Sequence, residues 1–133
     1  MNPRLLLDTH IAVRWLSFPG KLSREQTRVL DEAIRNGRRV GVSAISLLEM
    51  ALLSEGERRI TAGLKDLFHQ LDTNPAFGIL PLTSEVAREV AALGSSLRDP
   101  ADRVIVATAR IYRLPLLTSD QRIIESGLVP VIE

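Results

Sequence analysis

Five acidic residues in this chain stand at positions where carboxylates can act together. Each of them either follows a short apolar run or lies in the first turns of a segment with helical periodicity. They are Asp8, Glu49, Asp99, Asp102 and Asp120. Carboxylates gathered at one place bind a divalent cation, and such a cation activates water for attack on a phosphate ester.

Crowded carboxylates require a counter-charge. Two ionised carboxylates about 5 Å apart, at an effective dielectric of about 20, repel each other by roughly 3 kcal/mol. The chain has no cysteine, which excludes disulfides and zinc–thiolate sites, so any metal must be held by Asp, Glu or the two His. Oxygen ligands in an open crevice favour Mg²⁺ or Mn²⁺, which keep part of their water shell.

The pattern of apolar residues predicts the elements that position these acids. Short apolar runs predict strands, and stripes at helical spacing predict helices between them. The predicted strands cover residues 4–7, 39–42, 77–82 and 116–118, with an optional edge strand at 129–132. The predicted helices begin near residues 11, 23, 43–46, 60, 83 and 99, and the helix from residue 83 carries a stripe that reaches Leu97. Such alternation is typical of an α/β fold with helices on both faces of a parallel sheet.

This arrangement places the acids on one edge of the sheet. In a parallel sheet, residues just after the strands share an edge with the N-termini of the returning helices. We therefore expect all five acids to face the same crevice.

Helix capping is a second interpretation of the same residues. Asp8 and Asp120 suit the N-caps of the helices that follow them. Glu49 fits a capping box with Ser46, and Asp99 precedes a proline in the order typical of a helix start. Ser23-Arg24-Glu25-Gln26 is a further capping box, away from the acids. Capping alone leaves unexplained why acids follow nearly every strand on one edge.

Four segments together resemble the motifs of a known family. They are Leu5-Leu6-Leu7-Asp8-Thr9-His10, residues 42–49, residues 99–109 and Leu116-Leu117-Thr118-Ser119-Asp120. At these spacings the chain resembles the PIN-domain family, specifically the VapC-type toxins of type II toxin–antitoxin systems. The resemblance spans essentially the whole chain. It implies a single PIN-like domain over residues 1–133, an α/β/α three-layer sandwich with a central, mostly parallel sheet of four to five strands.

The resemblance also implies an activity. It predicts a Mg²⁺- or Mn²⁺-dependent endoribonuclease that cleaves RNA by in-line attack of metal-activated water. Its expected partners are a second copy in a homodimer and a VapB-type antitoxin that also binds DNA. By position, Asp8, Glu49 and Asp102 match the metal-binding acids of the family, and Asp120 matches the fourth, more variable catalytic acid. Asp99 is either a metal ligand, a helix cap, or both.

Three further residues are candidate substrate contacts. Thr9 and Thr118 fall where hydroxyls line such sites, and Arg103 follows Asp102 directly. Arg103 is a candidate phosphate contact, and a simple salt bridge is the alternative that its position favours.

Composition limits the other possibilities. A net charge of +1 excludes a globally basic nucleic-acid binder, so local patches must guide RNA. No apolar run approaches the roughly 18 residues of a membrane span, and the N-terminal run is too short for a signal peptide, which predicts a cytoplasmic protein without membrane partners. The stripe of Ile60, Leu64, Leu67 and Leu71 suits core packing, with an antitoxin groove as the alternative.

Two other functions compete with a nuclease. A haloacid-dehalogenase-like phosphatase also places an Asp after its first strand, but it normally has a second Asp two residues on, where this chain has His10. A non-catalytic PIN-like interaction module would need no metal chemistry. The full set of acids argues against this module, and RNA cleavage separates it from a nuclease.

Overall fold

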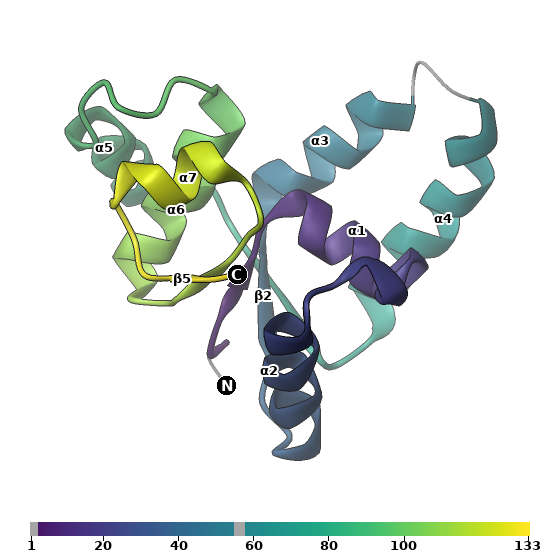
Figure 1. Cartoon of the computed structure of the whole chain (residues 1–133). Helices are drawn as coiled ribbons and strands as arrows, with labels where there is room; N and C mark the ends of the chain where they lie inside the picture. The colour runs from purple at the N-terminus through teal and green to yellow at the C-terminus, as the bar shows by residue number, and fades with distance from the viewer. Residues whose placement is uncertain (1–2, 55–57) are drawn as a thin grey trace.

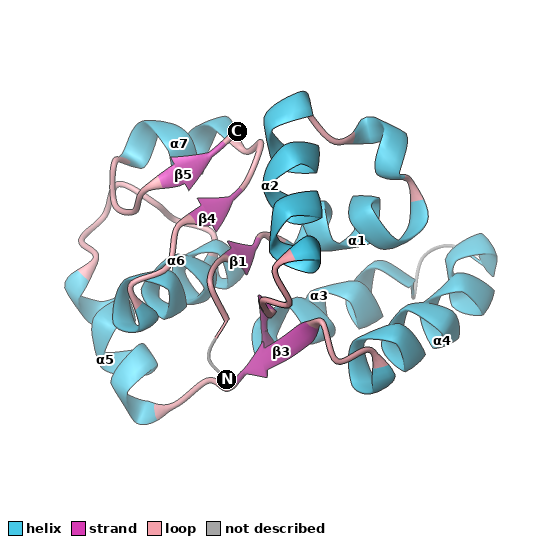
Figure 2. Cartoon of the chain, turned by 90° about the horizontal axis from the view of Figure 1, so that it is seen from below, coloured by secondary structure: helices cyan, strands magenta, loops and turns pink. Residues whose placement is uncertain are grey.

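A fully parallel sheet forms the centre of the molecule. The computed structural model describes residues 3–54 and 58–133. The strands are β1 (Leu6–Leu7), β2 (Val40–Ser43), β3 (Phe77–Leu80), β4 (Leu116–Leu117) and β5 (Val131–Ile132). They lie in the order β3-β2-β1-β4-β5, and every pairing is parallel (Figure 2). This confirms the predicted α/β fold, with the edge strand present.

Helices cover both faces of this sheet. They are α1 (Thr9–Ser17), α2 (Arg24–Arg35), α3 (Ala44–Ser54), α4 (Arg58–Thr73), α5 (Ser84–Ala92), α6 (Pro100–Tyr112) and α7 (Gln121–Ser126), with a 3₁₀ turn at Pro19–Lys21. Helices α1 and α2 lie on one side of the sheet and α5 and α6 on the other (Figures 1 and 2). Each strand therefore has apolar neighbours on both faces.

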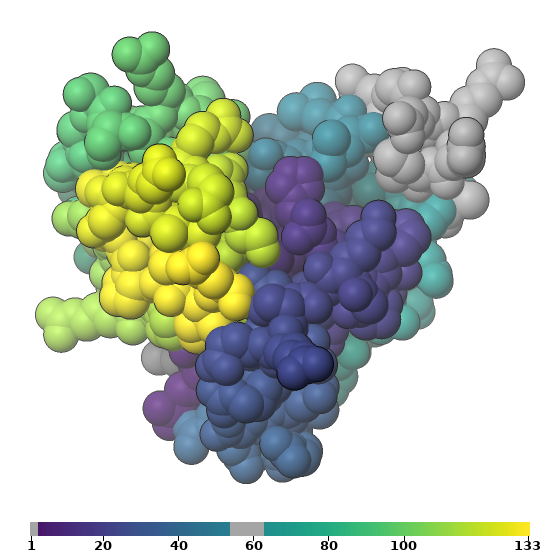
Figure 3. All heavy atoms as spheres, in the orientation of Figure 1, coloured from purple at the N-terminus to yellow at the C-terminus, as the bar shows by residue number. Residues whose placement is uncertain are grey.

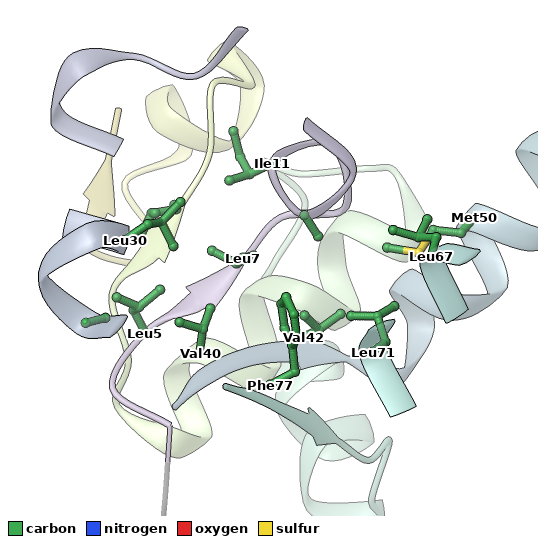
Figure 4. Packing of buried hydrophobic residues seen from close by; sticks show 13 residues of the cluster. Leu5, Leu7, Ile11, Leu30, Val40, Val42, Met50, Leu67, Leu71 and Phe77 are labelled. Carbon is green, nitrogen blue, oxygen red and sulfur yellow. The ribbon is translucent and has the colours of Figure 1, made fainter. Parts of the chain in front are cut away.

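The two faces are filled by alternate residues of the strands. Leu7 and Leu117 pack into the cluster formed with α1 to α4 (Figure 4). Leu6 and Leu116 pack into the cluster formed with α5, α6 and α7. All four leucines are fully buried, which is expected where successive side chains point to opposite faces of a covered sheet. The predicted three-layer sandwich is thus confirmed.

Two helix predictions need correction. The helix after β3 ends at Ala92 rather than reaching Leu97, because Gly94 takes a positive φ of 78° and turns the chain. Leu97 is still buried, since the loop folds back onto the core. Helix α7 is absent from the helices predicted by periodicity and is implied only by the capping interpretation of Asp120, because a helix of 6 residues is too short to show a periodic stripe.

The apolar stripe of α4 packs into the core. Leu67 and Leu71 are buried among residues of α1 and β3, which confirms core packing over an antitoxin groove for these two. The side chain of Ile60 lies outside the described residues. By contrast, Leu48, Leu52 and Leu53 of α3 are each half-exposed, at 53%, 54% and 50%. In the described part of the chain, no helix is both long and apolar enough to cross a membrane.

Candidate active site

Asp8 lies immediately after β1, at the carboxyl edge of the sheet, and is almost completely buried. The Thr118 hydroxyl donates to Asp8 Oδ2 at 2.8 Å, and the Thr9 amide donates to Asp8 Oδ1 at 2.8 Å. Burial raises the pKa of the Asp8 carboxyl, although these two hydrogen bonds oppose the shift. The side chain therefore caps α1, as the capping interpretation predicted, and it still faces the edge where the other acids lie.

Glu49 reaches this edge from α3. The Thr9 hydroxyl donates to Glu49 Oε1 at 2.5 Å and lies 2.8 Å from Ser46 Oγ. A hydroxyl has one proton, so Ser46 must donate to Thr9 while Thr9 donates to Glu49. The predicted capping box of Ser46 and Glu49 is wrong, because α3 begins earlier, at Ala44, and Ser46 is inside the helix. The Glu49 carboxylate is instead held by a residue of α1.

Asp99 and Asp102 occupy the first turn of α6. Asp99 is the N-cap, and its Oδ1 accepts from the Asp102 amide at 3.0 Å, with Pro100 at the first helical position. This confirms the capping role predicted for Asp99. The cap leaves Asp99 Oδ2 available for other ligands, so capping and metal binding are compatible in this geometry.

The acids lie within electrostatic reach of one another. The pKa of Asp102 is raised to about 7, first by burial and then by repulsion from neighbouring carboxylates. Those neighbours are Asp99, Asp8, Asp120 and Glu49. The structure therefore brings together all five acids that the sequence singled out.

Asp120 completes the group from the N-cap of α7. Its Oδ1 accepts from the Arg122 amide at 2.9 Å, and its Oδ2 lies 3.4 Å from the Arg122 guanidinium. The Asp120 amide in turn donates to the Thr118 hydroxyl at 3.1 Å. This carboxylate is thus part of an exposed ion pair, unlike the buried Asp8 and Asp102.

The hydroxyls of Thr9 and Thr118, which were predicted to contact substrate, hydrogen-bond to acids of the site. Thr118 uses its hydroxyl proton on Asp8 and accepts from the Asp120 amide. Thr9 uses its hydroxyl proton on Glu49. Both hydroxyls therefore hold acids in place.

Two hollows flank the acids on the molecular surface. One, of about 220 Å³, is lined by Asp8, His10, Ile11, Arg14, Ser119, Asp120 and Arg122. The other, of about 210 Å³, is lined by Ser96, Leu97, Arg98, Asp99, Asp102 and Arg122. In the space-filling view the surface is hollowed between the C-terminal part of the chain and helices α1 and α3 (Figure 3). Sequence reasoning missed Arg14 and Arg122, although Arg14 stands one helical turn after His10.

Arg103 points away from the acids. Its guanidinium donates to three backbone carbonyls at the end of α5 and in the loop before α6, those of Val90 at 2.8 Å, Gly94 at 2.7 Å and Leu97 at 2.5 Å. These hydrogen bonds to backbone carbonyls differ from both predicted roles of Arg103, the phosphate contact and the salt bridge. Arg103 instead fastens the loop that delivers Asp99 and Asp102 to the site.

Replacing Arg103 by alanine is expected to destabilise the protein by about 1–3 kcal/mol, because three carbonyls lose a charged donor. Urea unfolding measures the change in the free energy of unfolding. Arg35→Ala, at an exposed position of α2, is the matched control and should change it by less than about 0.5 kcal/mol. Equal effects of the two substitutions would contradict the fastening role.

The donor set fits a hydrated divalent cation. Within residues 3–54 and 58–133, no group of three or more Asp, Glu or His side chains is placed so that it could hold a metal ion by direct bonds. Mg²⁺ commonly binds through one or two carboxylates and keeps several waters, so it does not need such a cluster. The raised pKa values of Asp8 and Asp102 reflect buried acids without enough positive charge nearby. A cation of +2 charge would supply that charge.

The fold and the site are those of an α/β protein in which acids from four segments meet at the carboxyl edge of a parallel sheet. The profile of the PIN domain matches residues 5–127. The chain belongs to the PIN-domain family. It is similar to Ribonuclease VapC22 of Mycobacterium tuberculosis, with 35% identity over 125 residues, covering 90% of this chain and 88% of that protein.

Solved structures share the same fold. FitAcB from Neisseria gonorrhoeae has 26% identity and a TM-score of 0.68, covering 97% of this chain and 96% of its own. VapBC2 from Rickettsia felis, bound to a DNA fragment from its promoter, has a TM-score of 0.72 at 14% identity, with 96% of each chain covered. The second likeness is one of fold alone.

Proposed function

We propose that this chain is a divalent-metal-dependent endoribonuclease and the toxin of a VapC-type toxin–antitoxin pair. The observation that carries the proposal is the grouping of five carboxylates at one sheet edge, where burial and then the repulsion of the neighbouring carboxylates raise the pKa of Asp102 to about 7. The similarity to a ribonuclease over most of the chain supports RNA as the substrate.

The proposed roles follow from the contacts of each acid. Asp8, Glu49, Asp102 and Asp99 would hold Mg²⁺ or Mn²⁺, one or two of them by direct bonds and the others through the waters that such an ion keeps. Asp99 would use the oxygen that is not used in capping. When bound, such an ion makes a water nucleophilic at neutral pH and offsets charge on the phosphate. Asp120, paired with Arg122 at the rim, would be the fourth catalytic acid.

The basic residues around the two hollows are suited to bind the RNA backbone. Arg14 and Arg122 line one hollow, and Arg98 and Arg122 line the other. Phosphate contacts position a nucleic acid without reading its sequence, so these arginines would align the strand across the acids. The net charge of +1 is compatible with such local guidance.

The exposed leucines of α3 support the proposal that this helix binds other proteins. Leu48 and Leu52 are one helical turn apart and share a face, with Leu53 beside them, and all three are half-exposed. Apolar side chains grouped in this way mark interaction surfaces. We assign this surface to the partners of the proposed toxin, a second copy of the chain and a VapB-type antitoxin.

An RNA cleavage assay tests the proposal. Purified protein incubated with transfer, ribosomal and messenger RNA should give discrete fragments with Mg²⁺ or Mn²⁺ and none with EDTA. Release of phosphate from p-nitrophenyl phosphate, with RNA intact, would favour a phosphatase instead. Intact RNA together with Mg²⁺ binding would favour a non-catalytic interaction module.

A further inference from the structure

Gln26 is a polar side chain of α2 that is fully buried beside the site. Its carbonyl oxygen accepts from the Ser23 amide at 3.0 Å. Its amide nitrogen donates to Ser119 Oγ at 3.1 Å and lies 3.5 Å from the Thr118 carbonyl oxygen. A buried side-chain amide needs hydrogen-bond partners for both its oxygen and its nitrogen. Here the oxygen is bonded within α2 and its cap, and the nitrogen is bonded to the loop after β4.

Helix capping explains only the hydrogen bond of the Gln26 carbonyl oxygen. Gln26 and Ser23 form the capping box predicted from the sequence, in which Glu and Gln serve equally well. A helix N-terminus even favours the negative charge of Glu. Glutamate, however, has no donor for the loop after β4. The choice of Gln is therefore explained by the contact with Ser119 and Thr118, and the helix alone does not require it.

The loop held by Gln26 carries Asp120 and contacts Asp8 through Thr118. Thr118 lies between Asp8 Oδ2 and the Asp120 amide, with bonds of 2.8 Å and 3.1 Å. A shift of this loop would move the hydroxyl that orients Asp8 and would displace Asp120 at the same time. Gln26 itself touches neither acid in these contacts.

We infer that Gln26 is a positioning residue, which fixes the loop of residues 118–120 and, through Thr118, the carboxylates of Asp8 and Asp120. This inference rests on the proposed nuclease function for its kinetic consequence. Its structural part, the order of the loop, is independent of that function.

The test compares Gln26→Glu with Ser23→Ala. Gln26→Glu keeps the acceptor of the capping box and loses the donor to the loop, whereas Ser23→Ala breaks the capping box and keeps that donor. For Gln26→Glu we expect kcat for Mg²⁺-dependent RNA cleavage to fall by about 10- to 100-fold, the range seen for residues that support metal ligands. KM should stay within about threefold, because the substrate contacts are unchanged. Ser23→Ala should leave kcat within about threefold.

Hydrogen exchange of the Asp120 amide in metal-free protein is the second measurement. This amide donates to Thr118 Oγ1, so it should exchange at least about tenfold faster in Gln26→Glu and at the wild-type rate in Ser23→Ala. Because this readout needs no catalysis, wild-type protein that cuts no RNA would overturn the proposed function while exchange still decides the role of Gln26.

Ser119→Ala removes the same contact from an exposed position and covers the case in which Gln26→Glu fails to fold. It should change kcat and Asp120 exchange in the same direction, and the double variant should show less than the sum of the two effects. Equal effects of Gln26→Glu and Ser23→Ala, or wild-type exchange in both Gln26→Glu and Ser119→Ala, would overturn the inference.

Discussion

Asp102→Asn is expected to lower kcat/KM for RNA cleavage by at least about a thousandfold, which corresponds to roughly 4 kcal/mol of transition-state stabilisation. Asparagine keeps the size and shape of the side chain but removes the charge with which Asp102 would hold the cation. Asp102 is buried at the start of α6 and faces the other acids, so no exposed neighbour can replace it. Single-turnover cleavage at saturating Mg²⁺ measures the loss of the chemical step.

Two further variants make this result interpretable. Asp66→Asn, at an exposed position of α4, should cleave RNA at the wild-type rate. Asp99→Asn separates capping from metal binding, because asparagine is an equally good N-cap but a neutral ligand. Wild-type activity in Asp99→Asn would limit Asp99 to capping. Wild-type activity in Asp102→Asn would remove the basis of the proposed function.

The metal-free protein is expected to lose stability as the pH rises from about 4 to about 7. The ordinary pKa of an aspartic acid side chain, as in the unfolded chain, is 3.8, and the pKa of Asp102 in the folded protein is about 7. Between these values the folded state keeps a proton that the unfolded state has released, so unfolding becomes more favourable as pH rises. Burial raises the pKa of Asp8 in the same direction. Above about pH 7 the contribution of Asp102 levels off.

Asp102→Asn should remove this part of the pH dependence, since an amide does not titrate. In EDTA at pH 8 we expect the variant to be more stable than wild type by about 1–3 kcal/mol. Each unit of pKa shift corresponds to about 1.4 kcal/mol, and solvent screening reduces the total. At pH 4 the two proteins should be nearly equal. Thermal melts at both pH values measure the difference.

Mg²⁺ should reverse the order of stability at pH 8. An ion that binds only the folded state stabilises it by mass action, and the wild-type acids are expected to bind it more tightly. Wild-type Tm should therefore rise with Mg²⁺ while the Tm of Asp102→Asn stays nearly constant. Parallel rises in both proteins would place the ion elsewhere, and a wild-type protein that is more stable than the variant in EDTA would contradict the repulsion among the acids.

Several features of the fold and site were predictable from local sequence. Apolar runs located every strand, because a strand covered on both faces needs consecutive apolar residues. Asp99 before Pro100 and the box of Ser23 with Gln26 marked helix starts, since capping depends on residues within one turn. The five acids could be assigned to one edge because parallel strands share their carboxyl ends.

Other features depended on contacts between distant segments. The spacing of Ser46 and Glu49 fits a capping box, which was the alternative to a metal-binding role for Glu49, yet the hydrogen-bond partner of Glu49 is Thr9, 40 residues away in sequence. Arg103 was assigned to the site from its place next to Asp102, yet the position of the α5–α6 loop directs it to three carbonyls. No local pattern relates Gln26 to residues 118 and 119.

The sequence by itself determined the strands, most of the helices and the edge on which the acids lie, because periodicity and capping are local properties of the chain. Only the tertiary structure decided which hydroxyl holds which carboxylate and which side chains turn away from the site. These choices depend on distances of about 3 Å between groups far apart in the chain, and such distances are set by how the layers pack.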